Sequence, residues 1–263
     1  ANNFGNTVTF VGATLANVTV VDTTAFDIEA LTLSGALSVT AGGIVTDSGA
    51  LIIAGTTTVT ATGFDVTLNN ANNFGGAVSA SGLNVTLNDI NAIILGASTV
   101  TGALVVTNAG NVTQTGVLAV TGTTTLTPGA AFDVTLNSAN QFGGAVSVVA
   151  ATNVSITDAS GLALGAITAS GTLGATATTG NITNTGALVI TGVATFTAAS
   201  GADITLNNAG NNFGAAVAFV ASAGTLANVT VVDTTAFDIQ ALTLTGNLSV
   251  IANDGITNSG ALV

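Results

Sequence analysis

The chain has 263 residues, of which 48% are hydrophobic and 5% are charged, with 12 acids and no Lys, Arg or His. A net charge of −12 without any basic side chain argues against nucleic acid as a partner, because phosphate recognition depends on Lys and Arg. The chain is too apolar for a disordered protein, and no stretch reaches the ~18–20 uninterrupted apolar residues of a spanning helix, so we expect no membrane insertion.

A three-residue pattern, Asn/Asp–Val/Ile–Thr/Ser, recurs along the whole chain. Each copy predicts a short strand in which the central residue points inward and its neighbours point outward. In chain order the central residues are Val18, Val66, Val85, Val112, Val134, Val154, Ile182, Ile204 and Val229, with degenerate copies at Val45 and Ile256. We expect these side chains to stack as one buried column.

The spacing of the copies predicts the fold class. Successive copies lie 19–28 residues apart, which is typical of one coil of a solenoid. The sequence therefore predicts an all-β protein, a parallel and right-handed β-helix or β-solenoid of about eleven rungs. We expect a single continuous body over residues 1–263.

A second marker, Phe-Gly, recurs every 68–71 residues and indicates super-repeats of three rungs. It begins super-repeats at about 4–73, 74–141, 142–212 and 213–263, the last one partial. Its aromatic residues are predicted to fill one end of the core cross-section in each super-repeat. They are Phe4, Phe74, Phe142 and Phe213.

A longer echo joins the two ends of the sequence. Residues Leu15–Leu33 return as Leu226–Leu244 with one change, Glu29 to Gln240. Because the beginning of the chain resembles its end, and neither end shows a polar cap, we expect that copies can stack end to end.

Most acids fall in two columns, which are the candidate Ca²⁺ ligands of this chain because carboxylate and amide oxygens are hard ligands. The candidates are Asp65, Asp89, Asp133, Asp158, Asp203 and Asp233. Aligned rungs place the first column beside Asn84, Asn153 and Asn228, and the second beside Asn70, Ser138 and Asn208. An amide or hydroxyl between two carboxylates separates like charges, so charge spacing is the main interpretation and Ca²⁺ cross-bridging between solenoids the alternative.

No catalytic residue is predicted. The chain has no His, Lys, Cys or Tyr to act as base or nucleophile, and no cofactor is expected beyond that cation. The one close carboxylate pair, Asp27 and Glu29, becomes Asp238 and Gln240 in the echo. Asp47 aligns with Gln114, Asn184 and Asn258, which indicates a solvated turn. We expect a protein that is not an enzyme.

Outward Thr residues suggest one further alternative. The Thr of each copy forms a nearly unbroken ladder, and a flat Thr array is a feature of ice-binding solenoids. Two-row Thr-x-Thr segments such as Thr58–Thr60, however, occur once per super-repeat, so a structural Thr ladder is the main interpretation.

The segments Phe74–Ser79, Asn84–Asp89, Gly186–Gly192 and Asp203–Asn208 resemble repeats of filamentous-haemagglutinin-type bacterial exoproteins. The resemblance implies a parallel β-helix shaft, export, and a role in adhesion, biofilm or surface fibres. We therefore expect an extracellular or cell-surface protein whose main partner is itself, as a homopolymer or a longer array. The alternative is an adhesin stalk that binds host or neighbour-cell glycans.

Overall fold

The computed structural model describes residues 2–5, 7–12 and 15–263. All regular elements among them are β-strands, and parallel strands stack into a β-solenoid of about 12 turns. The expected fold class is confirmed, and its right-handedness stays a prediction. In this described part of the chain, no helix is long and apolar enough to span a membrane.

The chain divides into two compact units, Ala1–Thr124 and Thr125–Val263, and strand β16 (Thr124–Thr127) contains the division. A single continuous body over residues 1–263 stays a prediction.

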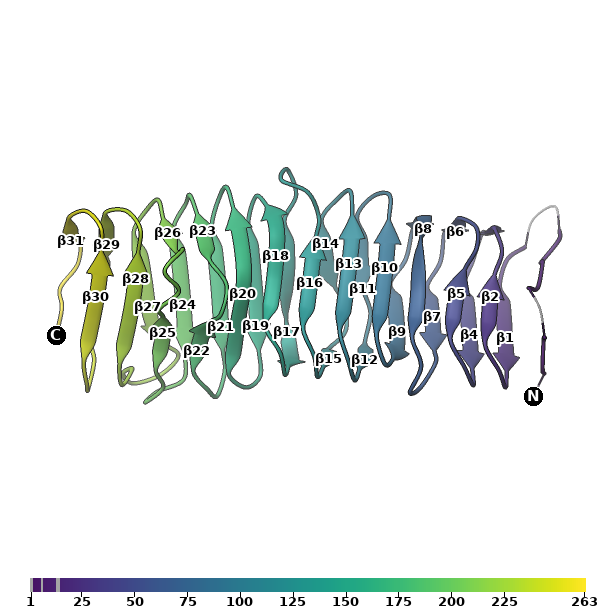
Figure 1. Ribbon diagram of the computed structural model, residues 1–263, viewed down its shortest axis with the longest axis horizontal. Coiled ribbons are helices and arrows are strands. Elements are labelled where there is room, and N and C mark those ends of the chain that lie inside the picture. Colours follow the sequence, from purple (N-terminus) through teal and green to yellow (C-terminus); the bar gives the residue numbers. More distant parts are fainter. Residues whose placement is uncertain (1, 6, 13–14) are drawn as a thin grey trace. The chain divides into compact units, whose positions relative to one another are not determined.

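In the first unit, each turn of the solenoid contributes strands to two parallel sheets (Figure 1). Their orders are β1-β4-β7-β9-β11-β14 and β2-β5-β8-β10-β13, and shorter ladders join β3, β6 and β8, and β9, β12 and β15. The strands are β1 (Val18–Asp22), β2 (Phe26–Ile28), β3 (Leu31–Leu33), β4 (Leu37–Ala41), β5 (Val45–Asp47), β6 (Leu51–Ile53), β7 (Thr57–Thr60), β8 (Val66–Phe74), β9 (Val78–Gly82), β10 (Val85–Asp89), β11 (Ile93–Leu95), β12 (Ser98–Val100), β13 (Leu104–Asn108), β14 (Val112–Gln114) and β15 (Leu118–Val120).

The second unit repeats this plan. Its sheets have the orders β17-β19-β21-β24-β27-β29-β31 and β18-β20-β22-β25-β28-β30, and β23 pairs with β20 and β26. The strands are β17 (Val134–Phe142), β18 (Val146–Ala151), β19 (Val154–Asp158), β20 (Leu162–Ala169), β21 (Leu173–Ala177), β22 (Ile182–Asn184), β23 (Leu188–Ile190), β24 (Ala194–Ala198), β25 (Ile204–Leu206), β26 (Asn212–Phe213), β27 (Val217–Ala221), β28 (Val229–Asp233), β29 (Phe237–Ile239), β30 (Leu248–Ala252) and β31 (Ile256–Asn258).

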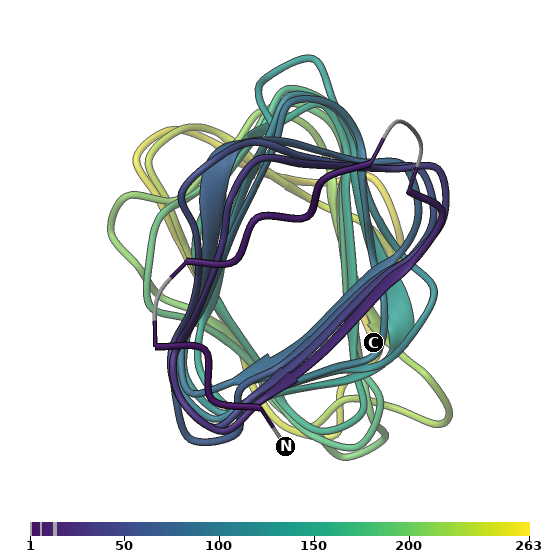
Figure 2. The ribbon, with the colours of Figure 1, turned by 90° about the vertical axis from the view of Figure 1, so that its right-hand side faces the viewer.

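Alternation of side chains accounts for these strands. In β1, the first, third and fifth residues are buried and the two between them are exposed. Successive turns within a unit overlie one another (Figure 2), so each inward residue packs on the inward residue of the next turn. Val45 lies opposite Val66, and Val66 opposite Val85, in parallel register. Hydrophobic burial therefore fixes the register, since a slip of one residue would turn every apolar side chain outward.

The predicted inward residues are buried, except Ile256, which is 53% exposed, and they do not form one column. In the first unit, Val66 and Val85 lie in the sheet of β8 and β10, whereas Val18 and Val112 lie in the other sheet. In the second unit, Val134 pairs with Val154 in one sheet. Ile182, Ile204 and Val229 stack in the other. Each run covers a few turns and the pattern then moves to the other sheet.

A half turn explains this change of sheet. From Val18, the register advances through Leu37 and Thr57 to Val78 in three full turns. The next copy of the pattern, at Val85, comes half a turn later, in β10 of the other sheet. The super-repeat therefore spans three and a half turns rather than the expected three, because individual turns take only about 20 residues.

The phenylalanines of the Phe-Gly marker take up core positions. Phe74, Phe142 and Phe213 are buried, and Phe4 is partly buried with its ring centroid 6.2 Å from that of Phe26. Phe213 contacts Phe196 edge-on at 6.0 Å and Phe237 at 6.1 Å. These rings fill the cross-section next to a corner of the turn, where the carboxylates described below are found.

Candidate functional site

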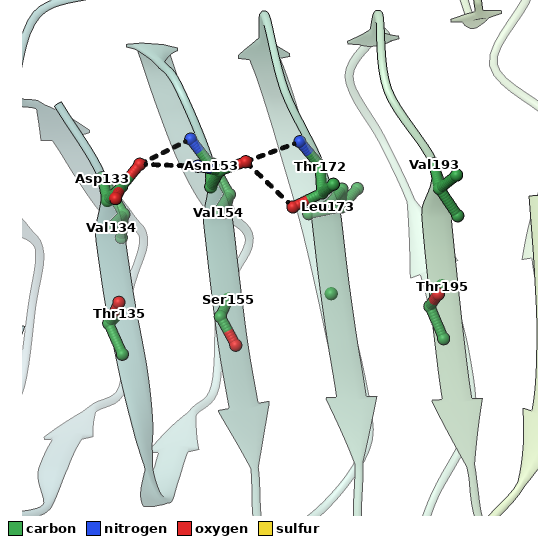
Figure 3. Close-up of a pocket in the computed structure, with 11 residues that line it drawn as sticks. Asp133, Val134, Thr135, Asn153, Val154, Ser155, Thr172, Leu173, Val193 and Thr195 are labelled. Carbon is green, nitrogen blue, oxygen red and sulfur yellow. Dashed lines mark hydrogen bonds between the residues drawn. The ribbon is translucent and has the colours of Figure 1, made fainter. Parts of the chain in front are cut away.

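A shallow groove of about 280 Å³ crosses the outward face of β17, β19, β21 and β24 in the second unit (Figure 3). Its floor contains one outward residue from each strand, in register: Thr135, Ser155, Gly174 and Thr195. Gly174 leaves the row without a side chain at one place, and an added Cβ there would find nothing nearer than Ser155 Oγ at 3.7 Å. The groove thus comes from one missing side chain in a hydroxyl ladder.

A hydrogen-bonded ladder forms one edge of the groove. Asp133 Oδ1 accepts from both Asn153 N and Asn153 Nδ2, each at 3.0 Å. Asn153 Oδ1 accepts from Thr172 N at 2.9 Å and from the Thr172 hydroxyl at 3.0 Å (Figure 3). The carboxylate is therefore stabilised by an amide on the next turn, as the sequence predicted for this column.

The same ladder recurs in both units. Asn84 donates to Asp65, and Asn228 donates to Asp203, through both the backbone and the side-chain nitrogen. Asn84 Oδ1 then accepts from Ala103 N at 2.9 Å. This approach needs Gly102, because a Cβ there would lie 2.3 Å from Asn84 Oδ1. In each ladder, a glycine precedes the residue whose N–H is donated to the Asn. The sequence did not indicate a role for this glycine.

The second column of acids lies inside the solenoid. Asp22, Asp89, Asp158 and Asp233 end their strands as inward residues, and all four are buried. Each accepts from the backbone N–H of a Phe-Gly phenylalanine on the preceding turn, at distances of 3.0, 3.3, 2.7 and 3.4 Å. Each also accepts from the backbone N–H two residues later. We call this arrangement the Asp corner.

The predicted neighbours of these corners were wrong. Asp89 lies opposite Asn72 rather than Asn70, and Asp158 opposite Asn140 rather than Ser138. In both partner strands, β8 and β17, the register shifts before this point. Two more residues lie between paired positions there than in β10 and β19.

The corner at Asp233 is displaced as well, by three residues rather than two. Thr234 N donates to Asn211 O at 2.9 Å, which places Asp233 beside Asn211 rather than Asn208. Counting residues from the triplet cannot detect such an insertion.

Asp47 was predicted in a solvated turn but is buried. Asp47 accepts from the backbone N–H groups of Asn69 and Asn70, at 3.0 and 3.3 Å, and from Asn72 Nδ2 at 2.8 Å. The equivalent Asn184 is also buried and donates to Asn211 Oδ1 at 2.7 Å. Asp47 is buried because side chains two residues apart on a strand point to the same face, and Val45 of the same strand points inward.

Two of the corners titrate differently. Burial raises the pKa of Asp89 to about 6, and this effect outweighs hydrogen bonds from the backbone N–H groups of Asn91, Phe74 and Ile90. Burial also works to raise the pKa of Asp22, but hydrogen bonds from Thr24, through its N–H and its hydroxyl, and from Phe4 hold that pKa below 3.8. The two corners differ in how strongly burial acts on the carboxyl, and also in the i+2 residue, because Thr24 offers a hydroxyl to the carboxylate and Asn91 does not.

The geometry favours backbone binding over Ca²⁺ at the corners. Both carboxylate oxygens of Asp89 and of Asp158 receive N–H groups, whose positive ends would repel a cation. Within the described residues, no group of three or more acids is close enough to hold a metal ion. Asp65, Asp133 and Asp203 remain outward, each bound to an Asn, so Ca²⁺ cross-bridging there stays a prediction.

The remaining acidic pair is also hydrogen-bonded to hydroxyls. Asp27 accepts from Thr46 and Ser48, and Glu29 accepts from the Thr9 hydroxyl. Two acids whose oxygens are occupied by neighbouring turns act as links between turns.

Comparison with known proteins identifies a repeat family for the chain but gives no activity. No curated protein and no solved structure matches the chain. A family model described as repeats of unknown function (DUF5649) matches residues 15–81, 82–149, 151–220 and 226–263. Its repeat length is that of the three-and-a-half-turn super-repeat, and the matches cover most of the sequence. The chain therefore belongs to the DUF5649 repeat family.

Proposed function

We propose that this protein is a structural, non-enzymatic component of an extracellular bacterial surface fibre, and that stacked solenoid turns form its shaft. The supporting observation is that the carboxylates described above hydrogen-bond to the preceding or following turn. Such an arrangement joins one turn to the next, which fits a structural role better than a catalytic one.

Stacking of further turns is supported by the last strands of the second unit. Leu248 in β30 lies opposite Val229, which is fully buried, yet Leu248 is 38% exposed. Leu242, Leu244, Leu248, Leu262 and Val263 line an apolar groove of about 260 Å³. A further turn, from a longer array or from a second copy, would bury this surface and pair its backbone edge.

The test is assembly of the purified chain, followed by sedimentation velocity and negative-stain microscopy. We expect concentration-dependent filaments. Leu262→Lys should abolish them by placing a charge in the apolar groove, whereas Ile44→Lys, at a residue of matched exposure (46% against 45%), should leave them intact. A chain that stays monomeric at all concentrations, or equal loss in both variants, would contradict end-to-end stacking.

Uncompensated charge supports a role for cations between shafts. Asp65, Asp133 and Asp203 lie on the outside of their units, and no basic side chain balances them. Loose Ca²⁺ bridging of neighbouring shafts is the cofactor role that this arrangement supports.

A second candidate function is binding of ordered water, including ice. In the first unit, register brings Thr19, Ser38, Thr58 and Ser79 into one outward row, and Thr40, Thr60 and Ser81 into a second. Two parallel hydroxyl rows on consecutive turns were not apparent from the sequence, because Ser replaces Thr in some of the strands.

Ice recrystallisation inhibition tests this candidate. Thr58→Lys should remove any inhibition, and Thr107→Lys, in β13 of the other sheet, should not. If the unmodified chain leaves crystal growth unchanged, this candidate function is rejected.

A further inference from the structure

A buried polar column passes through four successive turns of the first unit. Its members are Asp47 in β5, Asn72 in β8, Asp89 in β10 and Asn108 in β13. Asn72 Nδ2 donates to Asp47 Oδ2 at 2.8 Å, and the register places Asp89 between Asn72 and Asn108. All four side chains are more than nine-tenths buried, so each polar atom needs a partner within the protein.

One atom in this column lacks such a partner. Asn108 Oδ1 is buried and accepts no hydrogen bond from the described residues. Its orientation is fixed by the other end of the amide, because Nδ2 faces the carbonyl oxygens of Gly110, Asn91 and Asn111 at 2.7, 3.2 and 3.4 Å. Exchanging the amide oxygen and nitrogen would set Oδ1 against three acceptors, so the unpaired acceptor is not removed by a flip.

Asp89 differs from the other Asp corners in two ways. At the other three, the hydroxyl of the i+2 residue donates to the carboxylate, from Thr24, Ser160 and Thr235, whereas Asn91 offers only its backbone N–H. The other three also face alanine on the following turn, at Ala41, Ala177 and Ala252. Asp89 faces Asn108. The corner with the fewest donors to a carboxylate thus adjoins an unpaired acceptor.

We propose that Asp89 becomes a neutral carboxylic acid in the folded protein under mildly acidic conditions, that its O–H then donates to Asn108 Oδ1, and that this bond is a proton-dependent lock between β10 and β13. Protonation changes the carboxyl from an acceptor into a donor and satisfies the unpaired oxygen in the same step. Ionisation removes that donor and leaves a buried negative charge beside a carbonyl-type oxygen.

Surrounding charges are consistent with the neutral form. The chain has no Lys, Arg or His, so no cationic side chain can stabilise an ionised Asp89. Across β8 the acid of the same column is Asp47, held away from Asp89 by Asn72, and across β13 the facing group is the neutral Asn108. Burial accordingly raises the pKa of Asp89 to about 6.

The sign of the pH effect follows. A raised pKa means that the folded chain binds the proton more tightly than the unfolded chain does. Stability from the lock is fully present below the unfolded value of 3.8 and is lost as pH rises through about 6. Mild acid therefore closes the lock, and neutral or alkaline conditions open it.

The experiment measures the titration of the Asp89 carboxyl carbon by NMR in the ¹³C-aspartate-labelled full chain, with Asp89→Asn to assign the signal. We expect a midpoint near pH 6. Asn108→Ala removes the acceptor and gives Asp89 the facing alanine of the other corners, so the midpoint should fall by about one unit or more. Asn91→Thr adds the missing hydroxyl donor and should lower the midpoint in the same direction.

Thermal unfolding gives a second readout that does not depend on NMR assignment. The unmodified chain should lose stability as pH rises through about 6. Asp89→Asn, whose amide can donate to Asn108 Oδ1 at every pH, should lose this dependence. A carboxyl that titrates below pH 4, a midpoint unaffected by Asn108→Ala, or an unchanged pH dependence in Asp89→Asn would each overturn the proposal.

Discussion

At the scale of single residues, side-chain direction decides whether an acid joins turns from outside or from inside. Asp133 precedes an inward Val and lies outward, where Asn153 donates to it. Asp158 is an inward residue of the following strand and binds the backbone N–H of Phe142. Both acids were predicted as one kind of site. Their different environments follow from the two-residue period of a strand, because side chains an odd number of residues apart point to opposite faces.

A glycine beside the outward ladder gives a sharp prediction. Gly102→Ala should destabilise the first unit by about 1–3 kcal/mol, because the new methyl would lie 2.3 Å from Asn84 Oδ1. Chemical denaturation would measure the change in the free energy of unfolding.

Gly174→Ala is the matched control. Its Cβ would make only ordinary van der Waals contacts, so the variant should be neutral or stabilised by up to about 1 kcal/mol. Equal destabilisation of the two variants would show that the contact with Asn84 is not what requires glycine.

The pKa of Asp22 predicts an acid-sensitive corner. Because its folded pKa is lowered below 3.8, its stabilising effect is present above 3.8 and is lost as pH falls through the lower folded value. Asp22→Asn should therefore reduce the loss of thermal stability below about pH 4 relative to the unmodified chain. An unchanged acid transition in this variant would count against the assignment.

At the scale of elements, the Phe-Gly turn and the Asp corner belong together. The phenylalanine ring enters the core while its backbone N–H points to the carboxylate one turn away. One segment thus contributes hydrophobic burial and a buried hydrogen bond. The sequence showed the spacing of Phe-Gly, but its link to the acid depends on a register shift in β8 that has no sequence marker of its own.

Phe74→Ala tests this element. Phe74 is 1% exposed, and its truncation should cost about 3–5 kcal/mol through lost burial and the cavity left behind. Phe64→Ala is the control at a 43% exposed phenylalanine and should cost about 1 kcal/mol or less. Calorimetry or denaturant unfolding measures both variants, and similar costs would contradict the core position of Phe74.

At the scale of the whole molecule, packing and hydrogen bonds must offset the repulsion of 12 acids without a single basic side chain. Salt screens repulsion between outward charges, and buried ones are screened much less. The half turn in each super-repeat also matters within each unit. It moves the outward acids from one sheet to the other, as Asp133 beside β17 and Asp203 beside β25 illustrate, so they do not accumulate in one row.

Ionic strength is the corresponding test. The midpoint of thermal unfolding should rise between about 10 mM and 0.3 M NaCl, and the rise should be smaller in the double variant Asp65→Asn, Asp203→Asn. Ca²⁺ at equal ionic strength should cause a further rise with bundling if it bridges shafts. Equal effects of Ca²⁺ and Na⁺ would reject bridging, and a midpoint that falls with salt would reject charge repulsion as a limit on stability.

The sequence by itself determined the solenoid fold, the inward Val and Ile, the outward Thr and the Asp–Asn neighbours of the triplet. These features repeat locally, and a strand alternates its faces wherever it forms, so Val66 and Asp65 could be assigned from spacing alone.

The tertiary structure alone decided which turns lie against each other. Inserted residues in β8 and β17 moved the partners of Asp89 and Asp158, and turns of about 20 residues divided the Val and Ile residues between two sheets. The physical reason is that stacking depends on where each turn closes. Closure is set by packing at the corners, where Asn72 and Asp47 became buried, and not by the residues that repeat along the strands.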